Sequence, residues 1–552
     1  MMRQTNAARK MDRSNEYDYI IIGAGSAGCV LANRLTENPS TRVLLLEAGG
    51  WDGHPLLRIP LAWGRVFQQR LFDWQYFSEP EEAVNGRAIE CARGKVIGGS
   101  SSINAMAYVR GHRSDYDHWA ACGLGDWSFD KVLPYFRKQE SWEDGANALR
   151  GGDGPLVTRR SRYRDPIIQA FIDSGVAAGH VHNDDYNGPS QEGFGLLQST
   201  IRHGRRCSAS VAYLHPVRHR PNLKIEVRAL VQRIRFDSGR ARAVDYVQDG
   251  VSRCIASARE IIVSGGTINT PQILMLSGIG NPRELAAYSI PVVAPLIGVG
   301  QNLHDHASGQ VRFKRLPGGP FTSNMRLDRL GVEMMRAYLL GRGFATDLPS
   351  GFVAFLKTQP SLPGPDLQLL SNLAPLAAHP WLEPFVQRFE DSVSVRPVLL
   401  QPQSRGSVSL RSADPQAPVR IFQGLLTEQA DIEKLRDGIR LVREIAHQAP
   451  LQPFLKEEFD PGPSCVSDKD LEAYLRATTA TAHHPVGTCK MGTANDELAV
   501  VDPTLRVRGV RGLRVVDASV IPRIVSGNIN AAVIMIAEKA ADLIKHERDT
   551  PA

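Results

Sequence analysis

The sequence predicts an α/β domain with a Rossmann-like parallel sheet, built from discontinuous segments, and a second, α+β domain. Three observations support this prediction. A glycine turn joins an apolar strand to a helix near the start of the chain, strand-like runs return at 223–227, 229–234 and 259–264, and strands alternate with helices over 155–222 and 312–475. With 552 residues, 42% of them apolar, the chain can bury two cores.

The first unit, residues 17–50, has the pattern of a dinucleotide-binding βαβ fold. An apolar, β-branched run at 17–22 ends in a G-x-G-x-x-G turn, a helical stretch covers 26–38, and a second apolar run at 41–46 delivers Glu47. Gly23 permits the tight turn, Gly25 lets the backbone approach a pyrophosphate, and Gly28 lets helix and strand pack closely. The helix N-terminus then faces the phosphates, and Glu47 faces the ribose hydroxyls of adenosine. The alternative is an ordinary glycine turn that binds nothing.

Composition and charge exclude several classes of protein. No apolar stretch approaches 18 residues, so no transmembrane segment is expected. Seven scattered cysteines without C-x-x-C spacing favour reduced thiols in the cytoplasm over a disulfide framework, and no metal site is expected. The net charge of +7 is modest, and the basic cluster at 202–206 (RHGRR) has no interleaved aromatics, so we expect a solvated face and no nucleic-acid partner.

Residues 1–16 are polar and lack the apolar core of a signal peptide, which predicts a disordered extension; Met11 is an alternative start.

A second informative stretch is ARGKVIGGSSSINAMAYVRG, residues 92–111. Its paired glycines and three serines offer backbone donors and hydroxyls without bulk, which suits contact with a phosphate or a flat ring. A serine-capped helix start explains the same residues equally well.

These two stretches together resemble the glucose-methanol-choline family of FAD-dependent oxidoreductases, in particular its bacterial choline dehydrogenase-like members. Further family-like blocks lie at 265–280 (GGTINTPQILMLSGIG), 298–306 (GVGQNLHDH) and 483–492 (HHPVGTCKMG), and the resemblance runs over residues 17–544. It implies an α/β FAD-binding Rossmann-like domain at 17–154, 223–311 and 476–552. The substrate-binding domain, at 155–222 and 312–475, is then expected to place an antiparallel sheet over the flavin.

Oxidation of an alcohol by hydride transfer needs a base for the hydroxyl proton, and histidine has a suitable pKa. The resemblance makes His484, directly before Pro485, the active-site base. Asn528, just before the last helix, matches the position of a second family histidine or asparagine and is expected to bind the substrate oxygen; a plain helix cap is its alternative. His483 should point the other way in an extended segment and act structurally.

The resemblance and the βαβ pattern also give the expected FAD contacts. The family sometimes tethers its flavin to a histidine at the position of Ile103, so we expect non-covalent FAD, with His112 as the one nearby histidine that argues otherwise. The residues expected to bind the cofactor are Gly23, Ala24, Gly25, Ser26, Gly28, Glu47, Ala48, Arg93, Val96, Gly99, Ser100, Asn104, Ala105, Met106, Val231, Asp517, Ala518, Asn528 and Ile529.

The leading hypothesis is therefore FAD-dependent oxidation of a primary alcohol to the aldehyde, by hydride transfer to flavin N5 with His484 as general base. Electrons would pass to a quinone, a dye-like acceptor or oxygen. The alternatives are a lyase in which FAD is structural and a non-enzymatic flavin-binding protein. The sequence leaves open the alcohol, the acceptor, the oligomeric state, and whether the protein is free in the cytoplasm or peripheral to a membrane.

Overall fold

A computed structural model describes residues 16–316, 318–375 and 378–549. The predicted extension, apart from Glu16, and the alternative start at Met11 lie outside these residues. Within them, none of the helices combines the length and the apolar character that a membrane span requires.

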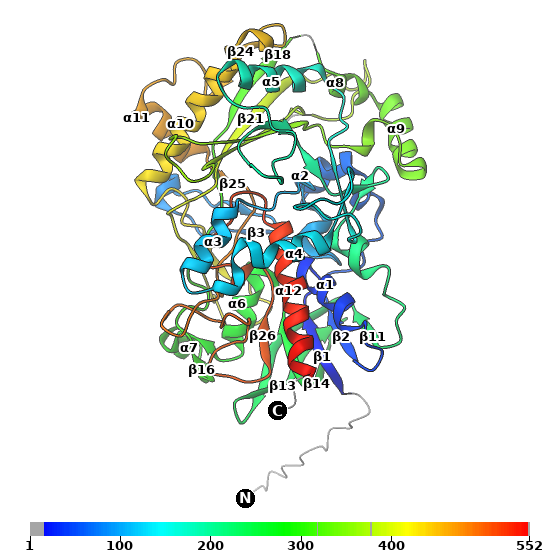
Figure 1. Ribbon diagram of the computed structural model, residues 1–552, viewed down its shortest axis with the longest axis vertical. Coiled ribbons are helices and arrows are strands. Elements are labelled where there is room, and N and C mark those ends of the chain that lie inside the picture. Colours follow the sequence, from blue (N-terminus) through cyan, green and yellow to red (C-terminus); the bar gives the residue numbers. More distant parts are fainter. Residues whose placement is uncertain (1–15, 317, 376–377, 550–552) are drawn as a thin grey trace, which may run out of the picture.

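A seven-stranded sheet contains the strand that precedes the glycine turn, and it forms the lower half of the molecule in Figure 1. The apolar runs predicted to be strands pair in parallel, and they are buried because helices cover them. The first half of β14 continues instead into an antiparallel meander with β13 and β12. The strands in sheet order are β11 (Leu223–Glu226), β2 (Val43–Leu46), β1 (Tyr17–Ile22), β14 (Val251–Val263), β13 (Arg240–Gln248) and β12 (Ala229–Asp237), with β26 (Leu513–Val515) beside β14.

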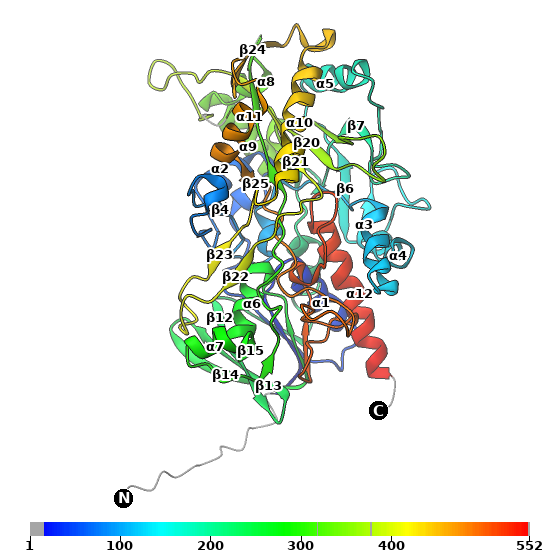
Figure 2. The same ribbon diagram turned by 90° about the vertical axis from the view of Figure 1, so that its left-hand side faces the viewer.

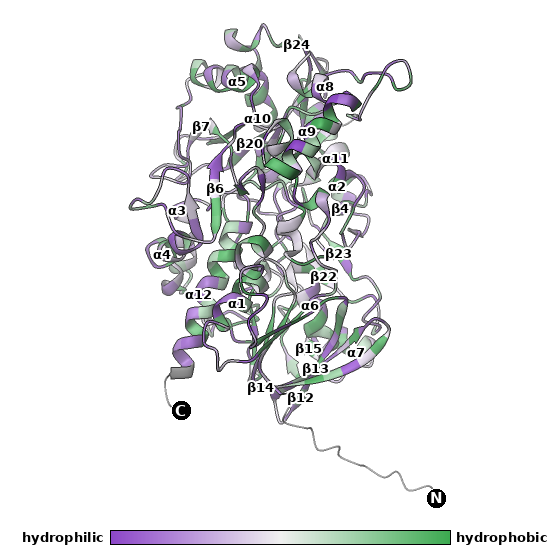
Figure 3. Cartoon of the chain, turned by 90° about the vertical axis from the view of Figure 1, so that its right-hand side faces the viewer, coloured by the Kyte–Doolittle hydropathy of each residue, from purple (hydrophilic) through white to green (hydrophobic). Residues whose placement is uncertain are grey.

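Two helices from opposite ends of the chain pack together on this sheet. α1 (Ser26–Leu35) follows the glycine turn, and α12 (Asn530–Asp549) is the last element; they lie side by side in Figures 1 and 2. The first turns of α12 are apolar and buried, and Figure 3 shows the helix turning hydrophilic toward its end. The core of this half thus depends on sequence segments about 500 residues apart.

An eight-stranded antiparallel sheet forms the upper half. α5 (Pro166–Ala177) packs on β7 and β19, and α10 (Gln429–Ala446) packs on β21, where alternate residues such as Val393 and Val395 are buried against it. The other residues of β21 face away from α10. The strands in order are β24 (Leu455–Asp460), β18 (Val311–Arg315), β21 (Ser392–Leu399), β20 (Leu367–Asn372), β19 (Phe352–Leu356) and β7 (Gly193–Leu196), with β17 (Ala307–Ser308) and β25 (Ala480–Thr481) at the side of β21.

The remaining helices are α2 (Trp63–Gln68), α3 (Arg113–Ala121), α4 (Phe129–Gln139), α6 (Gly266–Leu276), α7 (Pro282–Ala287), α8 (Pro320–Asn324), α9 (Leu327–Leu340) and α11 (Asp468–Thr478). Small sheets pair β3 (Tyr76–Phe77) with β4 (Glu90–Cys91), β9 (Ile201–Arg202) with β10 (Arg205–Arg206), β15 (Ile279–Gly280) with β16 (Ala294–Pro295), and β22 (Ser407–Ser409) with β23 (Arg420–Phe422), and join β5 (Glu140–Trp142), β6 (Leu156–Arg160) and β8 (Gln198–Ser199).

The fold class is as predicted, while the domain limits stay a prediction. Two segments assigned to the substrate domain lie with the parallel sheet. The turn Ser210–Leu214 packs on α1, and β22 joins β23 against α6 instead of extending the eight-stranded sheet.

Candidate active site

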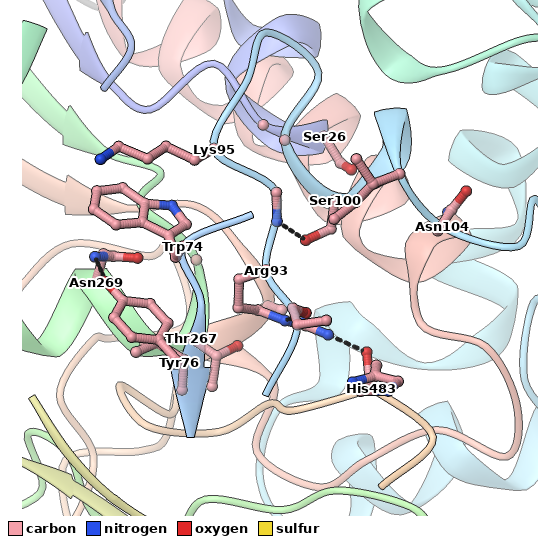
Figure 4. Close-up of a pocket in the computed structure, with 18 of the residues that line it drawn as sticks. Ser26, Trp74, Tyr76, Arg93, Lys95, Ser100, Asn104, Thr267, Asn269 and His483 are labelled. Atoms are coloured by element: carbon pink, nitrogen blue, oxygen red, sulfur yellow. Dashed lines mark hydrogen bonds between the residues drawn. The ribbon is translucent and has the colours of Figure 1, made fainter. Parts of the chain in front are cut away.

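A cavity of about 970 Å³ lies between the two sheets (Figure 4). Its size falls within the range of cofactor pockets. Most of the predicted site residues line it, although they come from segments scattered over the chain. These residues are Gly23, Gly25, Ser26, Glu47, Ala48, Arg93, Gly99, Ser100, Asn104, Ala105, Met106, Val231, His484, Asp517, Ala518, Asn528 and Ile529.

Ala24, Gly28 and Val96 lie behind the wall of the cavity and support it. The N–H of Ala24 donates to Glu47 Oε2 at 2.8 Å. A Cβ on Gly28 would come within 1.9 Å of the carbonyl oxygen of Gly23, so no other residue fits there. Val96 is fully buried in a small apolar cluster.

Two helix N-termini meet at the glycine turn. Ser26 Oγ at the start of α1 donates to Asn530 Oδ1 at the start of α12 at 2.6 Å. No side chain caps α1, so its first-turn N–H groups face the cavity wall without a capping partner. A Cβ at Gly25 would meet little, since this glycine borders the open cavity. The free donors, the two positive helix ends and the open glycine fit a pyrophosphate.

Glu47 is held rigidly at the end of β2. Its Oε2 accepts from Ala24 and its Oε1 accepts from the N–H of Gly49, both at 2.8 Å. Burial raises the pKa of this carboxyl to about 7, although the two N–H donors oppose that shift. The carboxylate therefore borders the cavity in a fixed orientation, as a ribose contact requires.

The stretch 94–106 wraps the cavity as a loop with one short 3₁₀ turn at Gly99–Ser102, so the alternative of a serine-capped helix start does not apply. The N–H of Gly94 donates to Ser100 Oγ at 3.2 Å (Figure 4). Arg206 supports the loop from behind by donating to the backbone and side-chain oxygens of Asn104, at 2.6 and 2.8 Å. Arg206 is buried, so the interpretation of the basic cluster at 202–206 as a solvated face was wrong for this residue.

Asp517 fixes the floor of the cavity between β26 and α6. Its Oδ2 accepts from Thr270 Oγ1 at 2.6 Å and from the N–H of Gly266 at 2.8 Å, and its Oδ1 accepts from Ser519. Burial raises the pKa of this carboxyl.

His484 and Asn528 meet in the wall of the cavity. Asn528 Nδ2 lies 2.9 Å from His484 Nε2, and His484 Nδ1 lies 3.0 Å from Nδ1 of His306. An amide N–H is a donor, so Nε2 of His484 is the acceptor, and Nδ1 carries the proton that it donates to His306. Burial, followed by the electrostatic interactions with the His306 ring and with the charge of Arg93, holds the pKa of His484 well below its usual value. His484 is therefore neutral near pH 7 and has an unprotonated nitrogen at the cavity.

Comparison with known proteins agrees with this geometry. The two models of the GMC oxidoreductase family match residues 17–308 and 402–537. The chain belongs to the GMC oxidoreductase family. Choline dehydrogenase of mouse mitochondria is 43% identical over 96% of this chain and 90% of its own length, and the oxygen-dependent choline dehydrogenase 1 of Chromohalobacter salexigens is 40% identical over 98% and 97%.

Solved structures of GMC relatives share the whole fold. Pyridoxine 4-oxidase from Mesorbium loti superposes with a TM-score of 0.86 at 30% identity, covering 96% of this chain and 99% of that one. A variant of formate oxidase from Aspergillus oryzae gives 0.88 at 28% identity, covering 97% and 98%. The predicted family, fold class and FAD cofactor, and the class of FAD-dependent oxidoreductase acting on CH–OH donors, are confirmed.

One expectation about this GMC protein was wrong in its geometry. His483 has a φ of +62°, which is left-handed and not extended, so the alternation of side chains along a strand does not apply. Both histidines line the cavity. Arg93 Nη2 donates to the carbonyl oxygen of His483 at 2.6 Å, and Figure 4 shows Arg93 reaching from the serine-rich loop to this residue.

Sequence reasoning did not assign roles to three residues beside His484. Asp305 accepts from the N–H of His484 at 2.8 Å, and His306 contacts its ring; both belong to the block at 298–306, which the resemblance had singled out. Arg396 lines the cavity from β21, and no motif surrounds it. In the described ranges no group of histidine, cysteine or acidic side chains could hold a metal ion.

Proposed function

We propose that this GMC oxidoreductase oxidises a primary alcohol to the aldehyde, with His484 as general base. The observation that supports the proposal most is the contact between neutral His484 and Asn528, at 2.9 Å, in the wall of the FAD-sized cavity. Bound FAD would supply the acceptor for the hydride, at its N5 atom. His484 Nε2 would take the hydroxyl proton, and the Asn528 amide would turn to stabilise the developing alkoxide.

The surroundings of His484 are suited to hold the required tautomer. His306 Nδ1 accepts a hydrogen bond from the N–H at Nδ1 of His484, and burial lowers the pKa of His306 to about 3, so His306 stays neutral and keeps its accepting lone pair. Asp305 holds the backbone of His484. These contacts leave Nε2, the nitrogen that faces Asn528, as the basic one.

We propose that the predicted cofactor residues hold FAD without a covalent bond. Ile103 borders the cavity at the position where some family members carry the tethering histidine. His112 is engaged elsewhere: it caps α3, and its Nδ1 lies 2.7 Å from Ser114 Oγ.

We propose a quinone or oxygen as acceptor, with the protein free in the cytoplasm or resting on a membrane surface. α9 supports the second location. Its outer face exposes Val332, Met335 and Leu339, at 56%, 63% and 62%, and the exposed Arg329 and Arg342 lie near its two ends. Figure 3 shows this mixture of hydrophobic and hydrophilic colour on α9. An apolar face flanked by arginines suits an interface with anionic lipid.

The membrane location is tested by flotation with vesicles. Wild type should float with vesicles containing phosphatidylglycerol, and a Met335→Glu, Leu339→Glu double variant should not. Equal flotation of the two proteins would overturn the role of α9, and no flotation of wild type would argue against the membrane location.

The reaction itself is tested by anaerobic mixing of the purified yellow protein with aliphatic, aromatic and amino alcohols, followed by air or a quinone. Bleaching of the flavin by an alcohol and its return with an acceptor are the expected results. A flavin that no alcohol bleaches, in a protein with FAD fully bound, would favour the lyase or the non-enzymatic alternative.

A further inference from the structure

The guanidinium group of Arg396 lies in the wall of the cavity, and no acidic side chain of the described residues pairs with it. Arg396 lies on β21, on the side of the strand that faces away from α10. Its Nη2 donates to Ser308 Oγ and, at 3.4 Å, to the carbonyl oxygen of Thr481. Within the described part of the chain, Nη2 is the one nitrogen of this group that makes a hydrogen bond, and no carboxylate forms an ion pair with it. Two donor nitrogens are thus left for a ligand.

The charge of Arg396 acts close to the proposed base. Burial lowers the pKa of Arg396, and no acid opposes the shift, but an arginine remains charged at neutral pH. The same charge helps to lower the pKa of both His483 and His484. Arg396 is therefore a neighbour of the place where the hydroxyl group must sit.

The carboxylates that line the cavity are all engaged elsewhere. Glu47 accepts from two backbone N–H groups at the glycine turn, and Asp517 binds α6. Glu79 pairs with Arg411 and Arg420. Arg396 is half-buried at the cavity, and no carboxylate of the described residues pairs with it, so its positive charge would be stabilised by an anion bound in the cavity.

Two of the aromatic side chains that line the cavity, Trp74 and Phe77, already face cations of the protein. Lys95 Nζ already lies 4.5 Å from the ring centre of Trp74, and the guanidinium of Arg70 lies 4.6 Å from that of Phe77. Two of the rings that could hold a quaternary ammonium group thus already face cations of the protein.

We propose that the alcohol oxidised by this protein carries a carboxylate, which binds the free donors of Arg396 while its hydroxyl group faces His484. The inference rests on the proposed function. The hydroxyl-bearing carbon loses a hydride to FAD, the hydroxyl proton goes to His484, and the C–O bond becomes a carbonyl. The carboxylate is unchanged, so the product is an aldehyde that still bears the anion.

Three alcohols with the same two-carbon arm test the charge preference: 3-hydroxypropanoate, the neutral 3,3-dimethylbutan-1-ol, and choline. Anaerobic flavin reduction by the holoenzyme should be most efficient with the anion and least efficient with choline. A charge-assisted hydrogen bond corresponds to roughly 10- to 100-fold in affinity, which sets the expected advantage of the anion over the neutral alcohol. Faster reduction by choline than by 3-hydroxypropanoate would overturn the proposal.

Arg396→Gln should remove this advantage and make choline a better substrate, because the repulsion is gone. Arg396→Lys should keep part of the preference for the anion, since it keeps the charge but loses the planar fork. Arg312→Gln is the matched control: Arg312 lies on the neighbouring strand β18, pairs with Asp460 at 2.7 Å and does not line the cavity. FAD content and the melting temperature identify any variant that has lost its fold. If Arg396→Gln does not fold, the charge preference of Arg396→Lys tests the proposal.

A binding measurement separates this inference from the proposed function. Propanoate, which carries no hydroxyl group, should perturb the absorbance of the bound flavin and compete with the substrate, and tetramethylammonium should not. Arg396→Gln should weaken propanoate at least tenfold, and Arg312→Gln should leave it unchanged. If no alcohol bleaches the flavin but propanoate binds and Arg396→Gln weakens that binding, the proposed function fails and the anion site stands. If propanoate binds equally well to wild type and Arg396→Gln, the anion site alone is overturned.

Discussion

Replacing His484 by alanine should leave FAD in place and remove most of the rate of flavin reduction. The ring contacts Asn528 and His306 and forms part of the cavity wall, but the glycine turn and the 94–106 loop are made by other residues. General-base catalysis contributes about 10²- to 10⁴-fold. At 1.36 kcal/mol per factor of ten, this loss corresponds to about 2.7 to 5.4 kcal/mol of activation free energy.

The assay is stopped-flow reduction of the flavin under anaerobic conditions, with a saturating alcohol, compared among His484→Ala, Asn528→Ala and His483→Ala. Asn528→Ala should cost no more than the roughly 10²- to 10³-fold of a lost oxyanion donor. His483→Ala should cost least, since His483 is held by its backbone oxygen and its ring packs edge-on against Phe67. If His484→Ala reduced its flavin at nearly the wild-type rate while Asn528→Ala or His483→Ala did not, the assignment of the base would be refuted.

Three further predictions concern the cofactor and pH. Glu47→Gln should weaken FAD binding by about 10- to 100-fold, the value of a lost charged hydrogen bond, without changing the reduction rate of the flavin that stays bound; unaltered FAD retention in equilibrium dialysis would contradict the ribose assignment. Acid or heat should release intact FAD, because Ile103 offers no tether, and flavin that migrates with the denatured chain would refute this. The pKa of His484 is lowered, and its neutral form is the base, so kcat/KM should hold as the pH falls through 6.5 and decline only in stronger acid; an acidic limb at or above pH 6.5 would count against His484.

Much of the fold follows from patterns that are local in the sequence. β1 and β2 are buried apolar strands, and the glycine turn and α1 lie between them in the chain. This order of strand, glycine turn, helix and strand is typical of a βαβ unit. α10 forms at Gln429–Ala446, within the region 312–475 where we predicted alternating strands and helices, because its apolar residues repeat with the helical period. The glycine turn and the serine-rich loop are local patterns too, and both border the cofactor end of the cavity.

Residues whose role depends on tertiary contacts could not be found in this way. Arg206 stands in a basic cluster that looks solvated, and only the packing of the 94–106 loop over it makes it a buried donor. Arg396 is one of two polar residues between buried ones on β21, and its significance depends on which groups the other strands bring to it. We predicted an extended backbone at His483, because a histidine gives no indication in the sequence that its backbone is left-handed.

The hydrogen bond between Ser26 and Asn530 makes cofactor capture a late event in the life of the chain. A ribosome adds about 5 to 20 residues per second, so the glycine turn leaves it about 25 to 100 s before the residue that completes the cradle. Until then the nascent protein has the glycine turn but lacks α12. We therefore expect a product truncated before α12 to bind FAD more weakly, although it would keep most of the cavity wall. The yellow colour would therefore report completed synthesis as well as correct folding.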